Sequence, residues 1–357
     1  MEHVATTITV PTPFALKPTV LANGWHECHP MSWSEGGRCL QIIERDGRRA
    51  YRVSVTEARR SAKSVSLAVA VDGNEVDDSA LDRACGDLRL VLGLDRDLSG
   101  FYEVCASHPT LRVLPRIGAG RGLRSASMTE NILKSLCQTN VAWAQAVKMI
   151  NRIGQLGPMV PNFANLTAWP TPREVLRAGR TYLTDVCRLG YRADTILKFC
   201  DDVCEGRFDP ESLDRKAADP RVTSEELLDE LYSIRGVGPG TASWLLSFLG
   251  RHDRLTIDSS TVAHVARVHT NGKKPTFKQI EKIYERYGAF KNMAWWYEHW
   301  LTWSTARTIV REARLDGVGN RRKVEKPKRQ NVKTSRRRNV DAVRWGNDGT
   351  STRLPRI

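Results

Sequence analysis

The sequence lacks the features of a membrane protein or a secreted, disulfide-rich protein. No apolar stretch approaches the length of a membrane span, and the first thirty residues do not combine a basic start with an apolar run. None of its eight cysteines forms a Cys-x-x-Cys pair, so they are expected to be reduced, mostly buried thiols. We therefore expect an intracellular protein that is soluble and has no contact with a membrane.

Groups of metal-ligating residues are also scarce. Cys200 and Cys204 are one helical turn apart but have no further ligand near them in the sequence. His252, His264 and His269 lack the spacing of a ligand set, and we interpret them as surface or capping residues. The sequence therefore predicts no metal ion and no cofactor.

Acidic residues are too few to balance the basic ones, and the excess is concentrated near the end of the chain. The net charge is +15, and ten Lys or Arg against Glu325 give +9 between residues 321 and 338. This segment has too few apolar residues for a core and suits phosphate attraction. The charge favours a polyanionic partner, but the tail alone would suit DNA, RNA or an acidic surface equally.

The hydrophobic pattern changes along the chain from strands to helices. Alternating runs bounded by turn residues such as Asp46-Gly47 and Asp72-Gly73 predict a small antiparallel sheet. From Ser79 onward the apolar period becomes helical. The expected strands are 40–43, 49–55 and 64–70, and the expected main helices are 130–138, 143–153, 172–178, 193–205, 225–234, 241–249, 259–268, 276–287 and 293–313.

These patterns predict a mainly α protein in three parts. We expect an N-terminal α+β domain over 1–112, a two-lobed helical core over 113–315, and a disordered basic tail over 316–357. The segment around Phe14 to Trp25 should pack against the sheet.

One turn between two predicted helices is rich in glycine. It contains Gly236, Gly238 and Gly240 at alternate positions, followed by Thr241 at the start of the next helix. Glycines permit positive φ and leave the backbone N–H groups accessible, so this turn could hold a phosphate at the positive end of the helix. A plain αα-corner would also use glycine, so the turn alone does not decide between the two.

An acidic residue follows this turn in the sequence. Asp258 stands at the head of another predicted helix, eighteen residues after Gly240. The pattern resembles the helix-hairpin-helix DNA glycosylases, in which a hairpin precedes a catalytic aspartate. Structurally, Asp258 could simply cap its helix, since Asp is favoured there. The two roles are compatible, because capping N–H groups favour the ionised form.

Further segments resemble the same superfamily, in matching order over residues 14 to 313. The stretch from Glu130 to Asn140 resembles its first core helix and the loop that enters DNA, which assigns Gln138, Thr139 and Asn140 to the wedge. Gly190, Tyr191 and Arg192 resemble a second phosphate-binding turn. The segment after Gly24-Trp25 resembles the N-terminal part of bacterial 3-methyladenine glycosylase II and its 8-oxoguanine relatives.

The resemblance implies removal of a damaged base that has been flipped out of duplex DNA. Asp258 would stabilise the positive charge that builds on the sugar. Bifunctional relatives carry a lysine at the start of the second hairpin helix, where this chain has Gly240, so hydrolysis without strand cleavage is implied. The iron–sulfur cluster of some relatives is excluded, because no cysteine follows Cys204.

Tryptophans are concentrated in the first half of the last predicted helix. Trp296, Trp300 and Trp303 would share one face. Core packing is the plainer interpretation of each. The alternative is that Trp296 and Trp300 line a pocket that stacks an electron-poor alkylated base. Trp143 and Trp244 are assigned to packing.

The preferred interpretation is a monomeric DNA glycosylase that acts on alkylated purines such as 3-methyladenine in double-stranded DNA. Excision of 8-oxoguanine-type bases remains an alternative, and so does a non-catalytic helix-hairpin-helix module. The protein is expected in the cytoplasm or, if bacterial, at the nucleoid.

Overall fold

The structure is a computed structural model that describes residues 2–163 and 165–322. Residues Met1–Arg314 form one compact unit, and a second unit covers Leu315–Ile357. The expected boundary near residue 112 therefore stays a prediction. The helical backbone continues to Arg322, beyond the start of the predicted tail, and the rest of that tail lies outside the described residues.

The N-terminal part contains a five-stranded antiparallel sheet in the order β1-β5-β4-β3-β2. All three predicted strands are confirmed. The Asp46-Gly47 turn joins β3 to β4, whereas Asp72-Gly73 ends β5 and makes no hairpin. Two strands were not predicted, because their alternation is weak or short. The strands are β1 (Glu2–Pro11), β2 (Met31–Ser34), β3 (Cys39–Asp46), β4 (Arg49–Arg60) and β5 (Ser64–Gly73).

Helices make up most of the rest of the described chain, as predicted. They are α1 (Leu16–Val20), α2 (Asp78–Val91), α3 (Ser99–Ala106), α4 (Met128–Cys137), α5 (Trp143–Gly154), α6 (Pro172–Asp185), α7 (Arg192–Cys204), α8 (Ser212–Ala218), α9 (Ser224–Tyr232), α10 (Pro239–Phe248), α11 (Ser259–His269), α12 (Phe277–Tyr284), α13 (Lys291–Trp300) and α14 (Ser304–Arg322). Short 3₁₀ turns lie at Gly24–Glu27, Leu111–Val113, Pro115–Ile117 and Glu285–Phe290.

Capping residues explain several helix boundaries. Thr171, Thr223 and Thr276 each accept a hydrogen bond from the third helical residue, whose side chain in turn bonds the cap backbone. The helix α9 therefore begins at Ser224, one residue before the predicted start at 225. The single helix predicted over 293–313 is instead two helices, α13 and α14.

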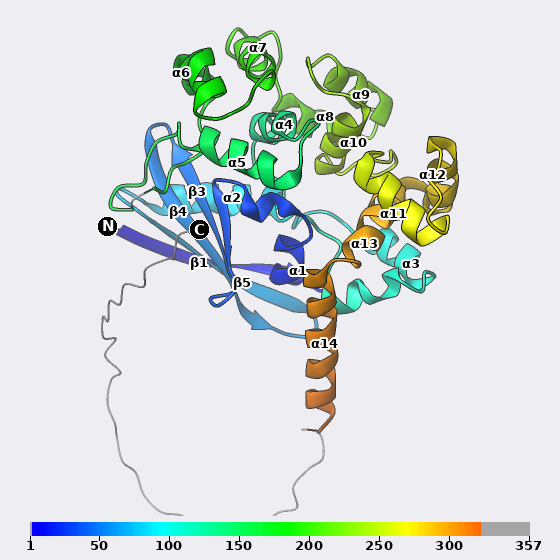
Figure 1. Ribbon diagram of the computed structural model, residues 1–357. Coiled ribbons are helices and arrows are strands. Elements are labelled where there is room, and N and C mark those ends of the chain that lie inside the picture. Colours follow the sequence, from blue (N-terminus) through cyan, green and yellow to red (C-terminus); the bar gives the residue numbers. More distant parts are fainter. Residues whose placement is uncertain (1, 164, 323–357) are drawn as a thin grey trace, which may run out of the picture. The chain divides into compact units, whose positions relative to one another are not determined.

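The larger of two clusters of buried hydrophobic residues runs from the sheet into the helices, which lie beside the sheet in Figure 1. The N-terminal segment supplies Phe14 and Trp25 to this core, and both are almost fully buried. Its backbone also contacts α13, because the Trp300 indole N–H donates to the Leu21 carbonyl at 2.8 Å. No helix in the described part of the chain is long and apolar enough to cross a membrane.

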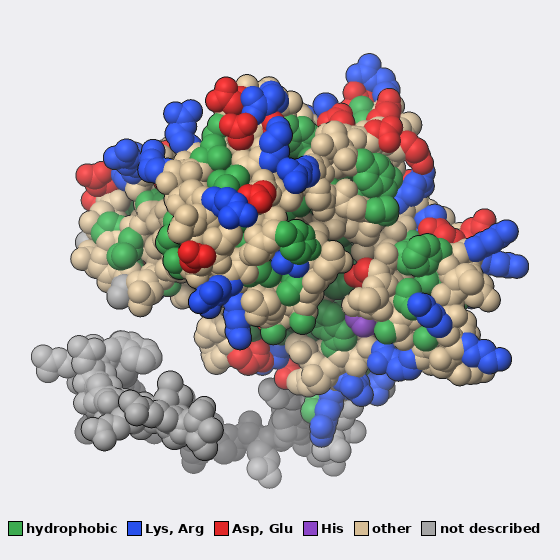
Figure 2. All heavy atoms as spheres, turned by 45° about the horizontal axis from the view of Figure 1, so that its top comes forward, with side chains coloured by type: hydrophobic (Ala, Val, Ile, Leu, Met, Phe, Trp, Pro, Cys, Tyr) green, Lys and Arg blue, Asp and Glu red, His purple; other side chains and the backbone are tan. Residues whose placement is uncertain are grey.

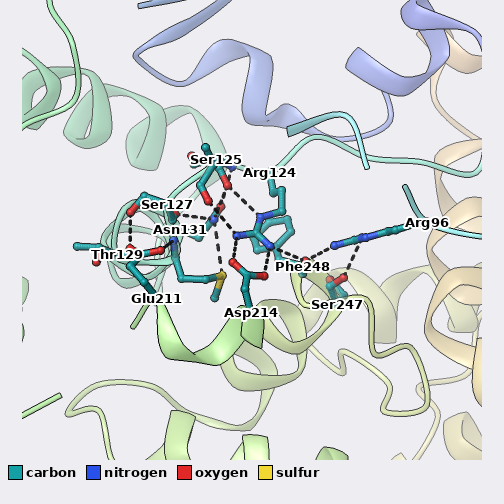
Figure 3. A network of polar contacts seen from close by, with 12 residues as sticks. Arg96, Arg124, Ser125, Ser127, Thr129, Asn131, Glu211, Asp214, Ser247 and Phe248 are labelled. Atoms are coloured by element: carbon teal, nitrogen blue, oxygen red, sulfur yellow. Dashed lines mark hydrogen bonds and ion pairs between the residues drawn. The ribbon is translucent and has the colours of Figure 1, made fainter. Parts of the chain in front are cut away.

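A buried ionic network fixes the helices around α10 (Figure 3). The Arg124 guanidinium bonds both carboxylate oxygens of Asp214 on α8, at 2.6 and 2.7 Å, and the Phe248 carbonyl at 3.1 Å. Arg96 also donates to the Phe248 carbonyl. Nearby, the Glu211 carboxylate accepts from the backbone N–H groups of Met128 and Thr129, both at 3.0 Å, at the start of α4. This network ties α4, α8 and the end of α10 together.

Candidate active site

The predicted hairpin is present between α9 and α10, but its glycines have different roles. Gly236 has φ +87°, and a Cβ there would lie 2.7 Å from the Thr195 side chain, so only glycine fits. Gly238 has φ −97° and is the N-cap of α10. Gly240 has no positive φ either. Of the three glycines, Gly236 is thus the one that uses the positive φ that glycine permits.

The N-terminus of α10 is open to an anion. Gly238 offers no side chain to cap the first turn, and Gly240 and Thr241 are partly exposed. At the opposite end, Arg96 and Arg124 bond the Phe248 carbonyl, as cations favourably do at helix C-termini. The free backbone N–H groups of the first turn can therefore donate hydrogen bonds to a phosphate.

Asp258 is the N-cap of α11, and this role occupies only one of its two carboxylate oxygens. Its Oδ1 accepts from the Thr261 backbone N–H at 2.8 Å and lies 3.0 Å from the Thr261 hydroxyl. No hydrogen bond joins Oδ2 to any described residue, and the residue is exposed. The cap therefore orients the carboxylate and leaves one oxygen available to a ligand.

Side chains of α13 hold the segment that precedes Asp258. The Thr256 backbone N–H donates to the Asn292 side chain at 2.9 Å, and the Trp295 indole N–H donates to the Thr256 carbonyl at 2.8 Å. Both Thr256 and Trp295 are buried. The carboxylate of Asp258 therefore stands on a fixed backbone.

Position 240 of the hairpin helix faces Asp258. A Cβ built on Gly240 would lie 4.0 Å from the Asp258 Cβ and 3.4 Å from the Ile257 carbonyl oxygen, both ordinary contacts. The structure thus joins the hairpin and the aspartate that the sequence separates by eighteen residues. A side chain at this position would project toward the carboxylate, and glycine leaves that space open.

A group of tryptophan rings lies beside α10. Trp244 lies one turn after Gly240 on α10, and its ring centroid is 4.9 Å from that of Trp296. Trp296 in turn contacts Trp303 at 5.9 Å. On its other side Trp244 packs against Trp25, with the ring centroids 6.2 Å apart. Trp25 in turn stacks on Trp143. Trp244, assigned to packing from the sequence, therefore belongs to the same aromatic group as Trp296.

Trp300 does not belong to that group. Its side chain is fully buried, and its indole N–H is bound to the Leu21 carbonyl. The structure places it in the core, so the pocket role considered for it from the sequence is not supported. Trp296 is only half-buried, although its indole N–H likewise donates to a backbone carbonyl, that of Ala22, at 3.0 Å.

His299 was not singled out from the sequence, yet it lies among these groups. Trp303 donates its indole N–H to His299 Nε2 at 3.3 Å, and the ring centroids of His299 and Trp296 are 6.1 Å apart. Burial lowers the pKa of His299 to about 4, with the Asp258 charge acting in the opposite direction, so the imidazole is neutral at pH 7. Figure 2 shows a recess on one face, with hydrophobic side chains, an acidic group and a histidine around it.

A small cavity, partly open to solvent, borders the aromatic rings. It has a volume of about 60 Å³ and is lined by Trp244, Phe248, His252 and Trp296, among others. Two tryptophan rings of the aromatic group therefore face this cavity.

The predicted wedge loop is held by a residue expected to bind DNA. Arg192 is 9% exposed, its Nε donates to the Thr139 carbonyl at 3.0 Å, and its guanidinium lies over the Tyr191 ring at 4.6 Å. Its donors are occupied inside the protein, so direct phosphate binding by Arg192 is not supported. The residue instead supports the loop from within.

The tip of this loop is exposed. Asn140 has φ +51°, and its side-chain amide lies 3.4 Å from the hydroxyl of Tyr191, which is 61% exposed. Gln138 turns back and donates to the Lys134 carbonyl at 3.2 Å. Of the predicted wedge residues, Asn140 is thus the one that reaches outward.

Of the three histidines interpreted as surface or capping residues, one is buried and two are partly exposed. His264 is 2% exposed, and both it and His269 contact the carboxylate of Glu298. His252 lines the small cavity, and burial lowers its pKa to about 3. The surface interpretation is therefore wrong for His264, because its partner Glu298 comes from a distant helix.

No model of a known protein family matches the sequence, and no curated protein matches it. Solved structures do match. A 3-methyladenine DNA glycosylase from Archaeoglobus fulgidus has a TM-score of 0.65 at 20% identity, over 82% of this chain and 96% of that one. MBOgg1 in complex with a low-affinity DNA ligand has a TM-score of 0.62 at 20% identity, over 87% and 99%.

An 8-oxoguanine glycosylase/lyase from Clostridium acetobutylicum, in complex with double-stranded DNA, has a TM-score of 0.61 at 16% identity, over 83% and 96%. The chain has the fold of the helix-hairpin-helix DNA glycosylases. This glycosylase fold confirms the predicted fold class, with its N-terminal sheet and helical core.

Proposed function

We propose that this protein is a monofunctional DNA glycosylase that hydrolyses the N-glycosidic bond of a flipped, damaged base. The observation that carries the proposal is the pair formed by Asp258 and Gly240. A carboxylate with one free oxygen faces the first turn of a helix that can hold a phosphate, and no amine projects from that turn. The fold shared with DNA glycosylases supports the same conclusion.

Asp258 would act on the sugar and not on the base. Bond cleavage builds positive charge on the sugar, and a fixed carboxylate stabilises that charge without reorganising. The Oδ2 atom could also orient or deprotonate a water molecule. Because Thr261 restrains Oδ1, the carboxylate loses little freedom when the nucleotide arrives.

Binding to DNA would use the open helix ends and the exposed loop tip. Gly238, Gly240 and Thr241 offer backbone N–H groups to a phosphate, and the turn at Gly190, which has φ +58°, offers a second such site. Asn140 and Tyr191, whose side chains lie 3.4 Å apart, would fill the space that a flipped nucleotide vacates.

The rings of Trp244, Trp296 and Trp303 favour an alkylated purine as substrate. Aromatic faces attract a base that carries a formal positive charge, by cation–π interaction. The neutral His299 adds no charge of its own that would repel such a base. An 8-oxoguanine-type substrate is the second candidate, favoured by the structural similarity to MBOgg1 and the clostridial enzyme.

A glycosylase assay on duplexes with single defined lesions tests this proposal. Release of 3-methyladenine or 7-methylguanine, with strand breaks appearing only after alkali, is the expected result. Release of 8-oxoguanine alone would favour the second candidate. DNA binding without release of any base, by the intact protein, would contradict the enzymatic role and leave a DNA-binding module.

A further inference from the structure

A cluster of ligand-type side chains borders the candidate active site, with the ring centroid of His264 5.1 Å from that of His299. It is formed by His264 and His269 of α11 and Glu298 of α13, whose side chains are 1%, 20% and 8% exposed. One potential ligand atom of each lies within 4.8 Å of the others. Tyr284 at the end of α12 joins them, with its hydroxyl 2.6 Å from Glu298 Oε2.

All of these contacts converge on a single oxygen. The Nε2 atoms of His264 and His269 lie 3.1 and 2.8 Å from Glu298 Oε2, the atom that Tyr284 also contacts. No hydrogen bond joins Oε1 to any described residue, and no Lys or Arg of the described chain pairs with this carboxylate. The cluster therefore brings one buried negative charge and two imidazoles around a common point.

We propose that His264, His269 and Glu298 bind a zinc ion through the two Nε2 atoms and a carboxylate oxygen. Two histidines and one glutamate are a familiar zinc ligand set, and bonds of zinc length separate neighbouring ligand atoms by about 3.3 Å. The two distances to Oε2 need to open by only a few tenths of an ångström to reach that spacing. The hydroxyl of Tyr284 would remain bonded to the carboxylate and orient it.

The ion would act as a structural clamp between α11 and α13. Asp258 caps the first turn of α11, whereas His269 is its last residue, so the clamp acts at the far end of the helix. Trp296 lies on α13, one turn before the end of that helix. The zinc would thus hold the two helices that carry the carboxylate and an aromatic ring, without touching the reacting atoms.

The rival explanation is a hydrogen-bonded network without metal. The second ring nitrogen of His264, Nδ1, is buried and has no partner among the described residues, which favours this rival. A ligating histidine usually donates a hydrogen bond from that atom. The two explanations differ in what a zinc ion does to the purified protein.

The test uses the full chain purified without a histidine tag and dialysed against zinc and then against metal-free buffer. Elemental analysis by mass spectrometry should find about one zinc per chain. The melting temperature should fall on treatment with a chelator and recover with zinc, because a ligand that binds only the folded state stabilises it. Cobalt substitution should give visible absorption bands that the His269→Ala variant lacks.

The variants separate ligation from hydrogen bonding. His269→Ala, at a partly exposed helix end, should lose the zinc and the chelator effect but still fold. Tyr284→Phe should keep the zinc, because it removes only the hydroxyl. His3→Ala, which removes an exposed histidine, is the matched control. The proposal is overturned if zinc-loaded wild type holds no more metal than His269→Ala, or if the chelator leaves its melting temperature unchanged. Neither measurement depends on glycosylase activity.

Discussion

Replacing Asp258 with asparagine tests the proposed chemistry with little disturbance of the fold. Asparagine caps a helix about as well as aspartate, and its side-chain oxygen can still accept from the Thr261 N–H. The stability of the protein should therefore change by less than about 1 kcal/mol. The variant removes the negative charge while keeping the shape.

The loss of activity should be large. Oδ2 is free in the structure and would face the sugar cation at close range. Removing a comparable preorganised group from an active site costs roughly 2.7–4 kcal/mol, or 10²–10³ in rate. Single-turnover base release should fall at least that far. DNA affinity should stay equal or rise, since a negative charge near the phosphates has gone.

The matched control is Asp77→Asn. Asp77 caps α2 with the same geometry, accepting from the Ala80 N–H at 2.9 Å, but it lies in the N-terminal part of the chain. Base release by this variant should stay within a few-fold of wild type. If Asp258→Asn released bases at the wild-type rate while folded, the carboxylate would be a helix cap and nothing more.

Three further predictions follow from named groups. Gly240→Lys should fold, because its Cβ meets only ordinary contacts, and borohydride should trap it on DNA, whereas wild type and Gly238→Lys should not be trapped. Arg124→Met should lower the free energy of unfolding by about 3–5 kcal/mol in chemical denaturation, because it strands a partly buried acid. Arg221→Met, in an exposed ion pair, should cost under about 1 kcal/mol, and equal losses would contradict this account. Truncation after Asn320 should weaken DNA binding and flatten its salt dependence in titrations, and an unchanged slope would show that the tail makes no DNA contact.

Local patterns predicted the elements that depend on neighbours in the sequence. The strands β3, β4 and β5 alternate between buried and half-buried residues, so the period of two was visible. The strand β1 was missed because only Ile8 and Val10 are buried in it, and backbone pairing with β5 holds the rest. The spacing between Gly240 and Asp258 was informative because both stand at helix N-termini.

The partners of buried polar groups were beyond such patterns. Arg192 resembled a phosphate ligand in its turn, yet it bonds Thr139, fifty-three residues earlier. Arg124 stands in the connection before α4, and its partner Asp214 lies ninety residues away. The positive charge of an arginine does not show which group its side chain will contact. An arginine near a glycine turn can therefore support a loop as well as bind DNA.

The same limit explains why the aromatic group was only half recognised. Spacing placed Trp296 and Trp300 on one face of a helix, but the N-terminal segment covers that face unevenly and buries Trp300 completely. Trp244, on another helix, completes the group instead. Helical periodicity shows which residues point the same way, whereas only the packing of separate elements decides which of them remain open to a ligand.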